Sequence, residues 1–158
     1  MIDGVVIKNL TVHKDIPDID DDRVKSGFLM EVLRADDGLL EKFGQSVFTV
    51  SHQGTIKAFH WHKKQDDLWF VASGKAKIVL YDMRKNSKTH RTTQVVYAGT
   101  DDYKLVFIPK GVVHGYKAVS KEPVLLFYHV TEMYDRDNPD EERIAYNDSD
   151  IGFDWSTD

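Results

Sequence analysis

The chain has 158 residues, which is enough for one domain with a substantial buried core. Its 26 acidic and 21 basic residues are well mixed and give a formal net charge of −5, which excludes the basic footprint of a nucleic-acid-binding protein. The sequence contains no cysteine, so disulfides, thiolate catalysis and cysteine–metal sites are excluded. No apolar run approaches the length of a membrane span, and the first residues lack the pattern of a signal peptide. We therefore expect a soluble protein of the cytoplasm that has no membrane partner.

The first third of the chain predicts two strands and one short helix. Residues 5–10 predict the first strand, and the polar stretch that follows it, up to Asp22, predicts a loop. Residues 27–33 predict a second strand, in which alternate side chains share a face. Residues 36–43 predict a short helix with an aspartate at its N-cap and Gly44 at its end.

Beyond residue 45 the predicted strands follow one another closely, with polar turns between them. They cover residues 47–52, 55–61, 68–72, 76–81, 92–97, 104–108, 115–119 and 124–131. About ten short strands with little helix indicate an all-β sandwich or barrel. We expect residues 1–158 to form a single domain, with the charged and then aromatic tail at 135–158 packing on the barrel.

Two histidines mark one predicted strand as the wall of a cavity. Side chains two residues apart on a strand point to the same face, so His60 and His62 look the same way. Asp67 follows shortly afterwards, and a Pro-x-Gly turn at 109–111 brings His114 to the start of a later strand. We expect these polar side chains to gather at one cavity.

The other histidines and the tryptophans have simpler interpretations. The histidines in polar or boundary contexts, which we expect on the surface, are His13, His52 and His90. The tryptophans are Trp61, Trp69 and Trp155, and their large apolar area favours a place in the cavity wall or the core. Tyr128 and His129 are neighbours on a predicted strand, so at most one of them points inward.

This set of side chains is suited to proton transfer at carbon. A neutral imidazole can remove a proton next to a carbonyl group, and a phenol across the cavity, such as Tyr128, can return a proton from the other face. The enolate that forms needs a cation or hydrogen-bond donors nearby. The candidates for that role are Lys57, Lys63, Lys64 and His114. These are the ingredients of an epimerase or isomerase.

A metal site is the competing interpretation of the same residues. The spacing of His60, His62, Asp67 and His114 resembles the metal-binding pattern of cupins, with aspartate where that pattern usually has glutamate. Three imidazoles and one carboxylate are suitable ligands for iron, manganese, nickel or zinc. The residues alone leave both interpretations open.

Five stretches of the chain carry a resemblance to one known family. They are residues 27–31 (GFLME), 54–60 (GTIKAFH), 81–89 (YDMRKNSKT), 108–115 (IPKGVVHG) and 147–155 (NDSDIGFDW). They resemble the motifs of the dTDP-4-dehydrorhamnose 3,5-epimerase family, in particular its Ile-Pro-x-Gly-Phe-Ala-His-Gly turn and its closing Asn-Asp-Pro-x-Ile-Gly-Ile-x-Trp. The resemblance extends over nearly the whole chain and is close to a shorter subgroup with a His-x-His-Lys-Lys run.

The resemblance implies a fold, a substrate class and an assembly. The fold is a cupin, a double-stranded β-helix jelly-roll barrel with minor helix, and the substrate is a nucleotide-diphosphate sugar. The family uses no cofactor. It forms homodimers by exchange of N-terminal strands, which is implied here too.

The resemblance also implies roles for single residues. His60 matches the general base of the family, Tyr128 its general acid, and Lys57 an arginine that contacts substrate. The chain departs from the family at two site positions. Asp67 stands where the family has its catalytic lysine, and His62 stands where it usually has glutamine.

Our first interpretation is a metal-independent epimerase of dTDP-4-keto-6-deoxyglucose. His60 would take the proton next to the C4 ketone, at C5 and C3, and Tyr128 would return one from the opposite face. We expect Asp67, or another carboxylate, to pair with His60 and to raise its pKa. The residues expected to bind substrate are Lys57, His62, Lys64, Arg84 and His114, of which His62 and His114 would contact the enolate.

Two further interpretations stay open. A dTDP-4-keto-6-deoxyhexose 3,4-ketoisomerase would use His60 and His62 together to move the carbonyl group. A metal-binding or sugar-binding cupin without epimerase activity would use the four possible metal ligands instead, and the aspartate in place of the family lysine favours it.

Overall fold

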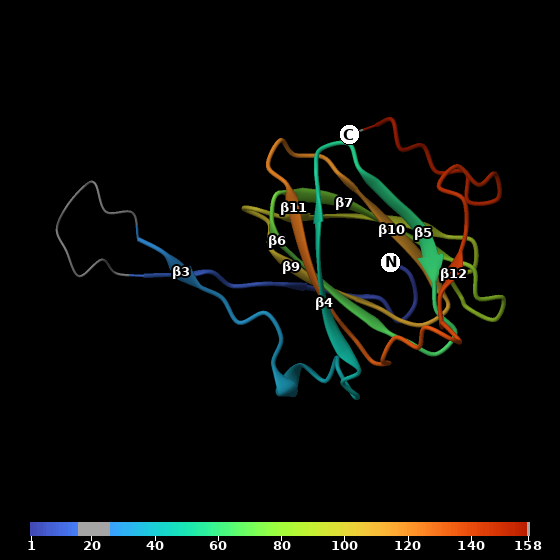
Figure 1. Ribbon diagram of the computed structural model, residues 1–158, viewed down its shortest axis with the longest axis horizontal. Helices are drawn as coiled ribbons and strands as arrows, with labels where there is room; N and C mark the ends of the chain where they lie inside the picture. The colour runs from blue at the N-terminus through green and yellow to red at the C-terminus, as the bar shows by residue number, and fades with distance from the viewer. Residues whose placement is uncertain (16–25, 158) are drawn as a thin grey trace.

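The computed structural model describes residues 1–15 and 26–157, and their regular structure is almost entirely β-strand (Figure 1). The strands are β1 (Val6–Asn9), β2 (His13–Lys14), β3 (Phe28–Leu29), β4 (Gln45–Ser51), β5 (Ile56–Trp61), β6 (Asp67–Ser73), β7 (Lys75–Asp82), β8 (Thr93–Gly99), β9 (Lys104–Ile108), β10 (Val112–Ala118), β11 (Val124–Val130) and β12 (Glu142–Arg143). A 3-10 helix, η1, covers Ala35–Asp37. The predicted loop that ends at Asp22 lies outside the described residues for most of its length. None of the helical structure described is long enough, or apolar enough, to cross a membrane.

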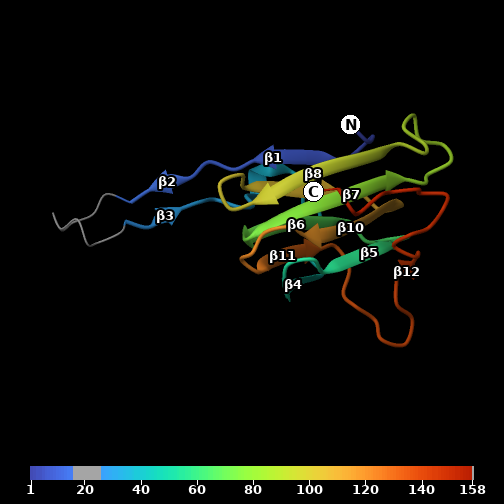
Figure 2. The same cartoon turned by 90° about the horizontal axis from the view of Figure 1, so that it is seen from above.

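Two five-stranded sheets form the barrel. The first sheet has the order β1-β9-β6-β11-β4 and the second the order β12-β5-β10-β7-β8, and neighbouring strands in both sheets are antiparallel. Strands distant in sequence are neighbours in both sheets, as in a jelly roll. The predicted all-β cupin barrel is therefore confirmed. The short pair β2–β3 projects from the barrel as an arm in both views (Figures 1 and 2).

The core lies between the two sheets and is made by alternate residues of their strands. Its members include Trp69, Val71, Ile78, Leu80, Val106 and Leu126, all buried. Strand β7 is buried on both faces, although a sheet with one wet face would show alternation. Its outer face is covered because Val79 packs in a second cluster with Ile151 and Trp155 of the C-terminal tail.

Two details of the N-terminal third differ from the prediction. The helix predicted over residues 36–43 is wrong, because η1 ends at Gly38, which takes the left-handed conformation with φ +65°. The strand predicted over residues 27–33 is reduced to Phe28–Leu29, whose partner β2 is itself two residues long. The barrel strands, in contrast, fall within a few residues of their predicted places.

Candidate active site

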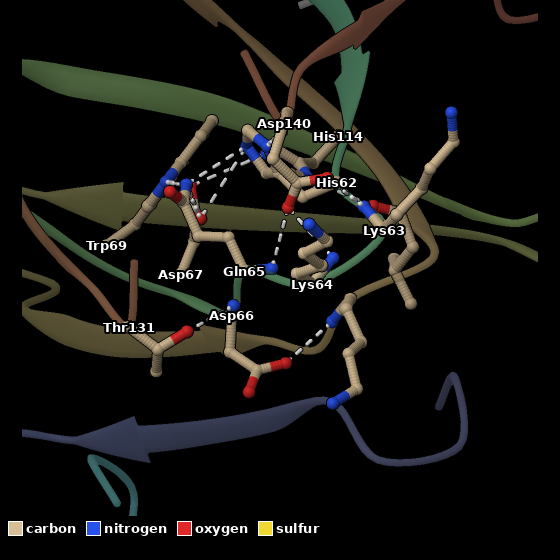
Figure 3. A network of polar contacts seen from close by, with 12 residues as sticks. His62, Lys63, Lys64, Gln65, Asp66, Asp67, Trp69, His114, Thr131 and Asp140 are labelled. Carbon is tan, nitrogen blue, oxygen red and sulfur yellow. Dashed lines mark hydrogen bonds and ion pairs between the residues drawn. The ribbon is translucent and has the colours of Figure 1, made fainter. Parts of the chain in front are cut away.

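The polar cluster is formed by residues from strands of both sheets, and Figure 3 shows three of its members, His62, Asp67 and His114. His60 on β5 and His114 on β10 are direct partners across the second sheet. Asp67 begins β6, and Tyr128 on β11 pairs with Trp69 of β6 across the first sheet. The site is thus built from both sheets, and the expected convergence of the predicted histidines and aspartate is found in the structure.

A tight turn holds His114 in place. Gly111 has φ +80°, which a side chain would strain, and its amide donates a 2.8 Å hydrogen bond to the carbonyl of His62. That bond ties the turn before β10 to the residue that follows β5. The two histidines therefore reach the site from segments that are fixed to each other.

Asp67 is buried, with 1% of its surface exposed, and faces two imidazoles. Its Oδ1 lies 3.7 Å from His62 Nε2 and its Oδ2 lies 3.6 Å from His114 Nε2. Gln65 Nε2 donates to Oδ1 at 2.8 Å and Trp69 Nε1 donates to Oδ2 at 3.0 Å. Burial alone would raise the pKa of Asp67, but the neighbouring imidazoles of His114 and His62 and the amide of Gln65 hold that pKa below its usual value.

The backbone fixes the tautomers of His62 and His114. His114 Nδ1 donates to the carbonyl of Val112 at 2.9 Å, and His62 Nδ1 donates to the carbonyl of Asp140. In the neutral form of each ring, the proton on Nδ1 leaves a lone pair on Nε2, which faces Asp67; in the protonated form Nε2 carries a proton toward the carboxylate, and this form lowers the pKa of Asp67. We assign the 3.2 Å contact between Gln65 Nε2 and His62 Nε2 as a hydrogen bond from the amide to that lone pair.

Asp140 also shapes the loop beneath the site. Its carboxylate accepts the backbone amides of Lys63, Lys64 and Gln65 at 2.8 to 3.0 Å (Figure 3). These bonds lower the pKa of Asp140 against the effect of its partial burial. The residues between His62 and Asp67 are therefore held by a side chain more than seventy positions later in the chain.

The pKa of His60 is lowered, first by burial and then by the neighbouring His114. The charge of Asp67 acts to raise this pKa, as predicted, but burial and His114 outweigh it. The predicted pairing of Asp67 with His60 is wrong, because the carboxylate lies closest to the other two imidazoles. The His60 and His114 rings meet edge to face with centroids 4.2 Å apart. His60 is neutral at physiological pH, as an acceptor of a proton must be.

Tyr128 faces His60 from the opposite sheet. Burial, and after it the charge of Asp67, raises the pKa of Tyr128 to about 12, so the phenol keeps its proton. Its hydroxyl has no hydrogen-bond partner within the described part of the chain. Its neighbour His129 points outward and bonds Ser46 at 2.8 Å, which agrees with the predicted alternation.

His60, Tyr128 and Glu141 line two adjacent cavities. The smaller, of about 80 Å³, also contacts His62 and Asp67. The larger, of about 510 Å³, also contacts Lys57 and Arg143. The larger cavity therefore contains two cationic side chains, of which Arg143 forms an ion pair with Glu141 at 2.7 Å.

Two of the predicted substrate-binding cations are engaged elsewhere. Arg84 forms an ion pair with Asp82, with Nε 2.8 Å from Oδ1, and Nη2 donates to the Asp3 carbonyl at 2.6 Å; it lines neither cavity. Lys64 is exposed, and its backbone amide donates to Asp140 beneath the site. Sequence reasoning missed Gln65, Asp140 and Arg143, because nothing in their local sequence distinguishes them from solvated polar residues.

The metal interpretation also has a geometric basis. One ligand atom from each of His60, His62, Asp67 and His114 can be chosen so that all lie within 4.8 Å of one another. His62, Asp67 and His114 are buried, whereas His60 is only partly buried, so the cluster is accessible from the side of His60.

The comparisons with known proteins find relatives among proteins of nucleotide-sugar and polysaccharide biosynthesis. A family model described as dTDP-4-dehydrorhamnose 3,5-epimerase matches residues 2–158. The spore coat polysaccharide biosynthesis protein SpsL of Bacillus subtilis is 49% identical over 157 residues, covering 99% of this chain and 98% of that protein. The crystal structure of a dTDP sugar isomerase from Desulfovibrio desulfuricans superposes with a TM-score of 0.85 at 26% identity, over 99% of this chain and 94% of that one. A dTDP-6-deoxy-D-glucose-3,5-epimerase from Legionella pneumophila, solved in complex with dTDP-4-keto-L-rhamnose, superposes with a TM-score of 0.80 at 26% identity, over 98% of this chain and 80% of that one.

Proposed function

The chain belongs to the dTDP-4-dehydrorhamnose 3,5-epimerase family, and on that premise we propose that it epimerises a dTDP-4-keto-6-deoxyhexose at carbons next to the C4 ketone. The family resemblance found in the sequence is confirmed, and the protein is an isomerase that acts on a nucleotide sugar. The 3,4-ketoisomerase alternative is not favoured. The sugar, the carbons inverted and the roles of single residues are our proposals.

One observation carries the proposed mechanism: His60 and Tyr128 come from opposite sheets and line the same two cavities. A sugar ring between them would have a base on one face and an acid on the other. His60, neutral because its pKa is lowered, takes the proton from carbon, and an enolate forms. Tyr128 then donates its proton to the opposite face of the same carbon, which inverts it. The imidazolium and the phenolate exchange protons with solvent before the next cycle.

The structure changes which side chains we propose as substrate contacts. Lys57 and Arg143 line the larger cavity together with His60, so we propose that they hold the diphosphate of the substrate. The ring nitrogens of His62 bond Asp140 and Gln65, so we propose that His62 fixes the loop rather than contacting the enolate. Arg84 is not proposed as a ligand, because it lines neither of the two cavities and its guanidinium bonds Asp82 and the Asp3 carbonyl.

We further propose that the protein is a homodimer in which the β2–β3 arm crosses to a second copy. The arm projects from the barrel and exposes Phe28 and Leu29 at 49% and 60%. Phe48 and Phe127 also expose 56% and 37% of their surface on the outer side of β4 and β11. Large apolar side chains exposed together favour a partner surface. We propose a cytoplasmic location, because a substrate that carries a diphosphate does not cross a bilayer unaided.

The test is proton NMR of dTDP-4-keto-6-deoxyglucose with the enzyme in D2O. Loss of the C5 and C3 proton signals is expected, and His60→Gln should abolish it. His52→Gln is the matched control, because His52 is exposed and remote from the cluster in the described structure. Full exchange with His60→Gln would refute the assignment of the base.

A further inference from the structure

The four-residue cluster has the properties of a metal site as well as those of a catalytic one. We propose that His62, Asp67 and His114, together with His60, bind one divalent first-row transition-metal ion. The question of binding is independent of the proposed epimerase function, and the two meet at His60.

The spacing of the buried atoms fits ligands of a single ion. Ligands about 2.1 Å from a tetrahedral ion lie roughly 3.4 Å from one another. Asp67 Oδ1 and His62 Nε2 are 3.7 Å apart, and Asp67 Oδ2 and His114 Nε2 are 3.6 Å apart. Both separations exceed a hydrogen bond and are close to the separation of two ligands. A small inward movement of each side chain would complete the coordination.

An unpartnered atom points into the cluster. His114 is 98% buried, and within the described part of the chain its Nε2 is the buried side-chain atom without a hydrogen-bond partner. Such a group is costly to bury unless something binds it. His62 Nε2 has only the amide of Gln65 as a partner, and an ion would replace that bond.

A bound cation would also offset the charge of Asp67, whose charged neighbours are otherwise the imidazoles of His62 and His114 when these are protonated. The hydrogen-bond donors to Asp67 are Gln65 and Trp69, which are neutral. Among the described residues, no lysine or arginine forms an ion pair with this carboxylate. Buried carboxylates are usually paired with a cation or bind a metal.

Outer contacts support the ligands as they do in metal sites. In such sites the second nitrogen of each histidine donates to a carbonyl or carboxylate, and ligating carboxylates are themselves hydrogen-bonded. The carbonyls of Val112 and Asp140 accept from His114 and His62 here. Trp69 and Gln65 hold the carboxylate. Three imidazoles and a carboxylate suit zinc, iron, nickel and cobalt.

The experiment uses the full chain, stripped of metal with a chelator. Equilibrium dialysis against Zn²⁺ should give one bound ion per chain, and Co²⁺ should produce the visible absorption bands of a four-coordinate ion. Asp67→Asn should weaken Zn²⁺ binding by at least about 100-fold, since loss of an outer-shell partner alone costs 10–100-fold. His62→Gln, which keeps a polar side chain able to donate and accept hydrogen bonds, provides a second variant if Asp67→Asn does not fold, and His52→Gln is the control.

The outcomes separate this proposal from the proposed function. Absence of saturable binding, or equal affinity in wild type, Asp67→Asn and His62→Gln, would overturn the metal site. An ion on His60 takes the lone pair needed for proton abstraction, so Zn²⁺ should slow the D2O exchange and a chelator should restore it. Stripped enzyme that exchanges protons but binds no Zn²⁺ would overturn the metal site alone. Stripped enzyme that regains exchange only with the ion would support the metal site and refute metal-independent epimerisation.

Discussion

Replacement of Tyr128 by phenylalanine separates the two proton transfers of the proposed mechanism. The hydroxyl has no hydrogen-bond partner in the described structure, so its removal leaves no donor or acceptor unpaired. The phenyl ring that packs against the core is kept, so we expect the change in stability to be about 0.5 kcal/mol or less and the melting temperature to stay within about 2 °C of wild type. The reaction itself should lose a general acid, which is worth roughly 10²–10⁴-fold in rate, or about 3–5 kcal/mol of barrier.

Two signals from one NMR sample in D2O test this reasoning. His60 remains in Tyr128→Phe, so deuterium should still replace the proton next to the ketone, while epimerised product should fall by the factor above. Loss of exchange in parallel with product would mean that Tyr128 takes part in proton removal. Product formation at the wild-type rate would refute its role as the acid.

Three further predictions follow from single contacts. Asp82→Asn should lower stability by about 1.5–3 kcal/mol at pH 7, because the buried carboxylate accepts bonds from Arg84, Ser87 and Thr89. These bonds lower the pKa of Asp82 from 3.8 despite its burial. The loss of stability in Asp82→Asn relative to wild type should therefore be full above pH 3.8 and should shrink as the pH falls below it. Thermal melts at several pH values would measure this. Gly115→Ala should lower stability by about 1–3 kcal/mol, because the new Cβ would lie 2.4 Å from Ala58 Cβ; an unchanged melting temperature would contradict the observed strand approach. When the pH is lowered, kcat/KM of the metal-free enzyme should begin to fall only below pH 6.5, because His60 stays neutral down to its lowered pKa. A fall in kcat/KM that begins above pH 6.5 would contradict that lowered pKa.

The barrel could be predicted because the local sequence of each strand shows the pattern of a β-strand. Alternating residues and regular turns locate β4 to β11 within a few residues. The strands that were missed, β2 and β12, are two residues long, too short for any periodicity to be visible. β12 exists because Glu142 and Arg143 pair with Trp61 and His60, a contact between segments about eighty residues apart.

The members of the site could be predicted, but their pairing could not. The two-residue spacing of His60 and His62 and the turn before His114 were sufficient to bring the histidines together. Which imidazole approaches Asp67 depends on the relative position of two sheets, and local sequence carries no information on that. The role of Asp140 depends likewise on a loop that folds back over the site.

The buried carboxylate places a condition on the proposed reaction. Proton removal puts negative charge on the ketone oxygen, and Asp67 is a negative charge in the same site. Two such charges 4 Å apart repel by about 4 kcal/mol at an effective dielectric constant of 20. The enolate oxygen should therefore lie on the side of the site away from Asp67. The cavity lined by Lys57 and Arg143 offers that side, together with the positive charge that offsets the enolate. We expect the ketone of the bound sugar to face this cavity, so Arg143→Gln should reduce kcat as well as raise KM, whereas a change in KM alone would show that Arg143 contacts only the diphosphate.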